Sequence, residues 1–184
     1  MQATLIRKQA TMTSSADAAM TTLSELSQPD FVARLGDIFE HSPWVAERSW
    51  HARPFPSIDA LHAAMVTAMT EASEAEQLAL IRAHPELAGK EAASGTLTAA
   101  STGEQRGAGL DQCSAEELQR LRSLNAAYQE RFGFPFVIAV KGRSRYQIMD
   151  AIEARLQNDT QKEFATCLGE IAQITRFRLY ALLA

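Results

Sequence analysis

The sequence predicts an all-α fold, a single-domain multi-helix bundle with one buried extended apolar segment at residues 134–140. Apolar residues recur at helical spacing through most of the chain. Several helix starts also carry the capping-box pattern, in which a Ser or Thr begins the helix and a Glu or Gln three residues later returns a hydrogen bond. These pairs are Ser73 with Glu76, Ser101 with Glu104, Ser114 with Glu117, Ser144 with Gln147, and Thr160 with Glu163.

The helices are expected in a definite order. The first presents Phe31, Leu35, Ile38 and Phe39 on one face until HSP at 41–43 ends it, and a short second helix runs through Trp50. The third begins at Ser57 and carries the apolar stripe of Ile58, Leu61, His62, Met65 and Met69. Later helices end at His84 and at Phe132, and two more cover residues 145–156 and 163–183.

The segment FPFVIAV, residues 134–140, has the apolar, aromatic and β-branched composition of a strand. Because no second strand is predicted for it to pair with, we expect it to thread between helices. Its backbone amides and carbonyls then need partners in helices, water or a ligand.

Composition limits the classes of protein. The 184 residues suffice for one domain, 46% of them are apolar, and the net charge is only -4. This balance does not indicate nucleic acid or an anionic membrane as a partner. No segment reaches the ~20 apolar residues that cross a bilayer. We expect a cytoplasmic protein whose residues 1–24 form a polar, poorly ordered leader and whose residues 25–184 form the domain.

His84 stands at the end of a predicted helix, in the stretch IRAHPELAGK. It follows Leu80 and Ile81 by four and three residues, so its side chain leans toward the apolar face. Pro85 disfavours helical geometry at His84, and the helix therefore ends with its last carbonyls beside the imidazole. That placement favours the protonated ring that a proton donor needs. The alternative is a histidine that only caps its own helix.

Ser101, Glu104 and Gln105 lie in the glycine-rich stretch LTAASTGEQRGAGLD. As a capping box, Ser101 and Glu104 need no further function. Glycine, however, costs about 1 kcal/mol relative to Ala in a helix interior, so a sequence selected only for helix stability would not contain so many. Close approach of a backbone or of a small ligand is one physical use of such residues.

Arg178 continues the apolar stripe of the last helix, seven residues after Ile171, whereas Arg176 points away from it. A guanidinium on a core face must find an anion or several acceptors, because a buried unpaired charge is costly. Pairing with Glu104 and binding of a ligand carboxylate or ureido group both satisfy this requirement. A purely structural ion pair is the alternative.

No zinc-ligand spacing, Walker loop, nucleophile elbow or dinucleotide fingerprint is present. We therefore expect no metal and no cofactor.

Five stretches taken together resemble the 2-oxo-4-hydroxy-4-carboxy-5-ureidoimidazoline (OHCU) decarboxylase family. In chain order they are RPFPSIDALHAAM, LIRAHPELAGK, LTAASTGEQRGAGLD, RFGFPFVIAVKGRS and TRFRL. The resemblance implies an all-α fold, a cofactor-free decarboxylation that yields (S)-allantoin, and a homodimer. It places the proton-donating histidine on His84 and a substrate-contacting segment on Ser101, Glu104 and Gln105. We expect Glu104 to be the second catalytic residue, which either orients His84 or accepts the hydroxyl or ureido hydrogens of the substrate. The substrate-binding positions fall on Pro85, Ser101, Gln105, Phe136, Val137, Ile138, Ala139, Val140 and Arg178.

Two other functions are compatible with the same residues. A helical ligand-binding module would use Arg178, Glu104 and the glycines to hold a ureide or a partner without catalysis. A different hydrolase or lyase acting on related compounds would use them for another reaction.

Overall fold

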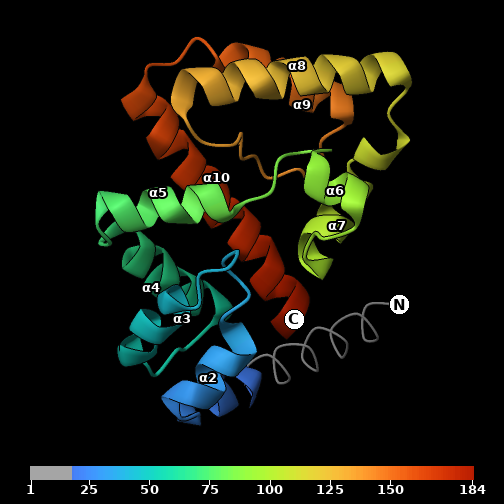
Figure 1. The fold of residues 1–184 in the computed structure, drawn as a ribbon. Helices are drawn as coiled ribbons and strands as arrows, with labels where there is room; N and C mark the ends of the chain where they lie inside the picture. Colours follow the sequence, from blue (N-terminus) through green and yellow to red (C-terminus); the bar gives the residue numbers. More distant parts are fainter. Residues whose placement is uncertain (1–17) are drawn as a thin grey trace, which may run out of the picture. The chain divides into compact units, whose positions relative to one another are not determined.

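The computed structural model describes residues 18–184, and every regular element in that range is helical, with no β-strand (Figure 1). This confirms the predicted all-α class. Within the predicted domain the helices group into two compact units. The first contains the described residues up to Gln77 and the C-terminal Thr175–Ala184, and the second contains Leu78–Ile174. The boundaries fall inside α5 (Glu74–Ala83) and α10 (Thr160–Leu183).

The first unit is built from α2 (Gln28–Leu35), α3 (Trp44–Ser49), the 3₁₀ turn η1 (Trp50–Ala52), α4 (Ile58–Thr70) and the adjoining ends of α5 and α10. Helix α3 packs against α2 and α4. The predicted stripes face the core, because Phe31, Leu35, Ile58, Leu61, Met65 and Met69 are all buried. The periodicity therefore identified this core correctly.

Residues 18–25 are also helical, and they bury Met20 and Leu23. Helical structure thus begins before residue 25, where we placed the start of the domain. Residues 1–17 of the predicted leader lie outside the described residues, and the boundary stays a prediction.

Helix α2 ends at Leu35, earlier than predicted, since the sequence placed its end at HSP, residues 41–43. Gly36 follows it, and the Gly36 amide donates to the carbonyl of Val32 at 2.8 Å. Glycine is a poor residue for continuing a helix, and the chain enters a series of turns instead. Ile38 and Phe39 remain buried, although they leave the helix.

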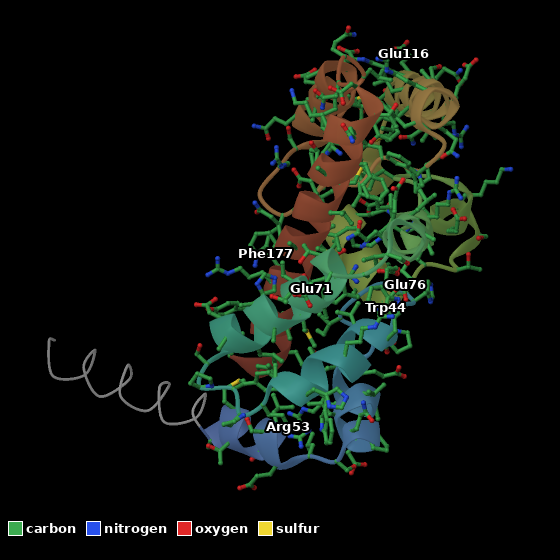
Figure 2. All side chains as sticks on the ribbon, turned by 90° about the vertical axis from the view of Figure 1, so that its left-hand side faces the viewer. Trp44, Arg53, Glu71, Glu76, Glu116 and Phe177 are labelled. Carbon is green, nitrogen blue, oxygen red and sulfur yellow. The ribbon has the colours of Figure 1, made fainter. Side chains whose placement is uncertain are left out.

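A small surface cluster in the first unit joins α3 to the start of α5. The guanidinium of Arg48 lies 4.6 Å from the centre of the Trp44 ring and forms an ion pair with Glu76; Figure 2 labels Trp44 and Glu76. Hydrogen bonds from Arg48 and Ser73 lower the pKa of Glu76 to about 2. The predicted Ser73–Glu76 capping box is present, with each backbone amide donating to the other side chain.

The second unit contains α6 (Lys90–Ser94), α7 (Ala99–Gly107), the 3₁₀ turn η2 (Leu110–Gln112), α8 (Ala115–Phe132), α9 (Arg145–Arg155) and the first part of α10. Helices α8 and α9 lie side by side (Figure 1). The capping boxes at Ser114 and Ser144 are both formed, as predicted. Helix α8 ends at Gly133, whose φ of 75° is the left-handed conformation that glycine adopts without strain.

Two of the predicted capping boxes are wrong. Helix α10 is capped by Asp159, whose Oδ1 accepts from the amide of Lys162 at 2.8 Å. Glu163 is not part of a surface cap, because it is fully buried and accepts hydrogen bonds from Tyr128, Arg155 and Asn158. The second wrong pair, Ser101 with Glu104, lies in α7.

Residues 134–140 form the expected segment between helices, with Phe134 and Phe136 to Val140 all buried. Tyr128 anchors its aromatic end, since the centre of the Tyr128 ring lies 4.7, 6.1 and 5.1 Å from those of Phe132, Phe134 and Phe136. In the part of the chain with assigned structure, no helix is long and apolar enough to cross a membrane.

Candidate active site

His84 follows directly after the last residue of α5, as the sequence predicts, and is 7% exposed. Its ring nitrogen Nδ1 lies 2.9 Å from the carbonyl oxygen of Leu80. Because a carbonyl only accepts hydrogen bonds, Nδ1 carries a hydrogen, and Nε2 is then the nitrogen that gains or loses a proton. The helix end thus fixes both the orientation of the ring and the atom that would take part in acid–base chemistry.

The loop after His84 is held by two amide side chains from different helices. The backbone amide of Ala88 donates to Oε1 of Gln105 in α7 at 2.9 Å. Nδ2 of Asn125 in α8 donates to the carbonyl of Leu87 at 3.0 Å. Ala88 has a φ of 50°, which is strained for a residue with a Cβ, so its conformation depends on such contacts.

Arg82, two residues before His84, joins the end of α5 to the end of α8. Its Nε and Nη2 both donate to the carbonyl of Gly133, at 3.2 and 3.1 Å. Gly133 immediately precedes the buried segment 134–140. The position of His84 is therefore coupled, through Arg82, to the start of that segment.

Helix α7 carries the polar residues that the sequence analysis selected. Its N-cap is Thr98, whose hydroxyl accepts from the backbone amide of Ser101 at 3.2 Å. Ser101 is therefore inside the helix, and the capping-box interpretation of Ser101 with Glu104 is wrong. Ser101 and Gln105 are buried and Glu104 is half-buried. Capping of the helix therefore does not explain the presence of Ser101 and Glu104 in α7.

The glycines of α7 are not required by packing among the described residues. A Cβ added at Gly103 or Gly107 would have no heavy atom within 4 Å. The sequence suggested that these glycines allow close approach of either a backbone or a small ligand. No backbone approaches Gly103 or Gly107 closely, which leaves the ligand as the other suggested use. Gly109 differs, because its φ of 72° itself favours glycine.

The backbone of residues 136–140 is partly engaged by side chains. The carbonyl of Val137 accepts from Nη1 of Arg155 at 2.8 Å. The amide of Ala139 donates to Oε2 of Glu170 at 2.8 Å, and the Ala139 carbonyl accepts from Nε of Arg143 at 3.2 Å. These contacts supply part of the hydrogen bonding that the buried segment needs. They also mean that the Ala139 amide already has a protein partner.

Arg178 is buried and Arg176 is exposed, as the helical stripe predicts. Nη1 of Arg178 lies 2.8 Å from Oε2 of Glu40, which is 2% exposed, and 3.4 Å from the carbonyl of Ile38. The anion that the buried guanidinium requires is therefore supplied by Glu40, a residue that the sequence analysis did not select. Arg178 lies in the first unit, whereas His84, α7 and residues 136–140 lie in the second.

A cavity of about 330 Å³ opens in the second unit beside Gln105. Of the predicted site residues, Gln105 lines it, whereas His84 and Ser101 do not. The lining residues are Ala88, Ala92, Ala93, Leu97, Thr102, Gln105, Arg106, Leu110, Asp111, Leu118 and Arg122. Among the described residues, no three His, Cys, Asp or Glu side chains are grouped to hold a metal ion.

Two residues that hold this region were not selected from the sequence. Asn125 interrupts the apolar stripe of α8, and a polar residue at such a position was the available signal. Its Oδ1 is buried and has no hydrogen-bond partner in the structure of residues 18–184. Arg155, at the end of α9, gave no signal, because arginine in a last helical turn is common on solvated faces.

The fold and the candidate site together define an all-α protein with a buried histidine at a helix end. The family model for OHCU decarboxylase matches residues 24–180. The OHCU decarboxylase of Halalkalicoccus jeotgali is 42% identical over 86% of this chain and 89% of its own. The uric acid degradation bifunctional protein of Bacillus subtilis is 42% identical over 87% of this chain, which spans 32% of that protein.

A crystal structure of (S)-allantoin synthase superposes with a TM-score of 0.70 at 28% identity, over 89% of this chain and 54% of the other. This chain thus spans about half of that protein. The chain belongs to the OHCU decarboxylase family, and it is a carbon–carbon lyase. The resemblance found in the sequence is confirmed.

Proposed function

We propose that the protein converts OHCU to (S)-allantoin during urate degradation, without a cofactor, and that His84 delivers the proton. The observation that carries this proposal is the buried imidazole at the end of α5, with Nδ1 directed to the Leu80 carbonyl. The names of the similar decarboxylases and of the uric acid degradation protein support the substrate and the process.

The reaction needs little from the protein beyond binding and proton delivery. Loss of carbon dioxide from the carbon that bears the carboxylate and hydroxyl leaves an electron pair, which the adjacent ring imine delocalises. The protein must hold the ring, orient the departing carboxylate out of the ring plane, and deliver a proton to one face of the carbanionic intermediate. Protonation from one face produces a single enantiomer.

His84 suits this step because its two nitrogens have different tasks. The hydrogen on Nδ1 stays with the Leu80 carbonyl, and the protonated ring gives the hydrogen on Nε2 to the ureido-bearing carbon of the former imine. The hydroxyl proton passes to the ring nitrogen, so the carbon that lost carbon dioxide becomes a carbonyl of allantoin. The last carbonyls of α5 carry partial negative charge, which stabilises the imidazolium. Proton transfer by a positioned side chain contributes typically ~10² to 10⁴ in rate.

The other predicted residues bind the substrate in this proposal. Glu104 either orients His84 or accepts the hydroxyl or ureido hydrogens, and Ser101 adds a neutral hydrogen bond. Gln105 uses its Oε1 on the Ala88 amide, so Nε2 is the group that donates to substrate. Pro85 and the main chain of 136–140 contact the ring, and Arg178 binds anionic or carbonyl oxygens.

We also propose, from the family resemblance, a homodimer in the cytoplasm. Sedimentation of the purified protein tests the dimer directly. A monomer at micromolar concentration would contradict it.

The function is tested with freshly generated substrate and circular dichroism, which follows the optical activity of the product. His84→Asn should fold normally and lose the acceleration of (S)-allantoin formation by at least about 100-fold. The matched control is His51→Asn, an exposed histidine in η1, which should keep wild-type activity.

Three results would contradict the proposal. Near-normal turnover by His84→Asn would remove the histidine from the chemistry. Racemic product at the uncatalysed rate with wild-type protein would indicate a ligand-binding module, and a different product by NMR would indicate another enzyme.

A further inference from the structure

The main chain of residues 136–140 is held by a buried arginine on α9. The side chain of Arg155 is 11% exposed, and its Nη1 donates to the carbonyl of Val137 at 2.8 Å. The guanidinium also lies 4.4 Å from the centre of the Phe136 ring. One side chain thus fixes both a backbone group and a ring of the segment.

Glu163 holds this arginine in place. Nε of Arg155 donates to Oε1 of Glu163 at 2.8 Å, and Glu163 is fully buried. Tyr128 and Asn158 donate to the same carboxylate. Burial is the largest single effect and lowers the pKa of Arg155, but the hydrogen bond to Glu163 and the nearby Cys167, Glu163 and Tyr128 together outweigh it and raise the pKa. The guanidinium therefore stays charged, and its four hydrogen-bonded and ring contacts leave it few alternative positions.

The side-chain hydrogen bonds to this segment fall on alternate residues. Residues 135–140 run without a turn or bend. In an extended chain, the backbone groups of successive residues point in alternate directions. The groups held by side chains belong to Val137 and Ala139, which share a direction. An extended run directs the backbone groups of Ile138 to the other edge, opposite those of Val137 and Ala139.

We propose that Arg155 is a positioning residue, which presents the opposite edge of 136–140 to the substrate by holding the Val137 carbonyl. The inference rests on the proposed function, in which this main chain binds the ring. Main-chain contacts of this kind act on substrate and transition state alike. Their loss therefore raises KM more than it lowers kcat.

Arg155→Lys is the informative variant, because it keeps the charge opposite Glu163 but removes the planar fork that reaches Glu163 and Val137 together. We expect KM to rise about tenfold, the size expected for one or two lost hydrogen bonds, with kcat changed less than about threefold. Hydrogen exchange of the peptide covering 134–141 should become faster, while exchange in α7 stays unchanged.

The matched control is Asn158→Ala, which removes the 2.7 Å hydrogen bond to Glu163 without touching the segment. It should lower thermal stability and leave KM within about twofold of wild type. If Arg155→Lys does not fold, Arg155→Met with Glu163→Leu removes both charges together, a replacement that buried ion pairs often tolerate. The double variant should show the same rise in KM and the same faster exchange.

A merely structural Arg155 gives a different result. The folded fraction and the maximal rate would then fall together, with KM and the exchange of 134–141 unchanged, and the inference would be overturned. Absence of turnover in the wild-type protein would overturn the proposed function instead. The exchange measurement would still decide whether Arg155 positions the segment.

Discussion

Nδ2 of Asn125 lies 3.0 Å from the carbonyl oxygen of Leu87, so α8 holds the loop that follows His84. The Asn125 side chain is buried, and its Oδ1 has no partner among the described residues. This hydrogen bond determines that Nδ2 of Asn125, and not Oδ1, faces the loop. With the amide reversed, Oδ1 would lie against the carbonyl oxygen of Leu87, and neither oxygen can donate a hydrogen bond.

Replacements at Asn125 should follow from this geometry. Asn125→Asp puts a carboxylate against the Leu87 carbonyl in a buried position and should cost more than about 3 kcal/mol of unfolding free energy. Asn125→Leu leaves the carbonyl without its donor but also removes the buried Oδ1, so it should cost only about 1–2 kcal/mol. Urea unfolding measures both. Equal losses would contradict the assigned orientation of the amide.

Thr98 and Ser101 should have different effects, because the first caps α7 and the second lies inside it. Thr98→Ala should lower the unfolding free energy by about 1 kcal/mol through loss of the cap. Ser101→Ala should mainly lower (S)-allantoin formation. Urea unfolding and product formation are measured on both variants. A Ser101→Ala enzyme with wild-type kinetics would remove Ser101 from the site.

Glu117 should contribute to stability only above a low pH. A hydrogen bond from Tyr146, then those from Ser114 and Arg145, lower the pKa of this carboxyl from 4.5 to about 2. The pKa of Glu117 is lower in the folded than in the unfolded protein. The contribution of its carboxylate to the free energy of unfolding is therefore complete above about pH 4.5 and is lost as the pH falls toward about 2.

Glu117→Gln should therefore be less stable than wild type at pH 7, and the difference should disappear by about pH 2. Unfolding in urea at pH 7, 4 and 2.5 measures it. The control is Glu116→Gln, at the neighbouring exposed position labelled in Figure 2. A difference that stays constant down to pH 2.5 would show that the charge is not involved.

The sequence predicts what depends on local pattern. The burial of Arg178 and the exposure of Arg176 follow from helical spacing, and the position of His84 follows from the proline after it. The cap at Ser101 was misassigned for a local reason too, since Thr98 three residues earlier offers an equally good hydroxyl.

Contacts between distant segments could not be predicted in the same way. Glu40 precedes its partner Arg178 by 138 residues, and Val137 precedes Arg155 by 18, so no periodicity relates them. The family resemblance selected 136–140 as a binding stretch, but the side chains that hold that stretch follow only from the fold. Residue patterns thus identified the candidate chemistry, and the three-dimensional contacts identified its support.

The stretch between Arg82 and Ala88 is attached at both ends. Arg82 is hydrogen-bonded to Gly133 and Ala88 to Gln105, and His84 lies between these two attachments. One residue inserted or deleted here would displace the imidazole even if every existing side chain were kept. The number of residues between Arg82 and Ala88 is therefore more constrained than most of their identities. Natural insertions and deletions should occur in other loops.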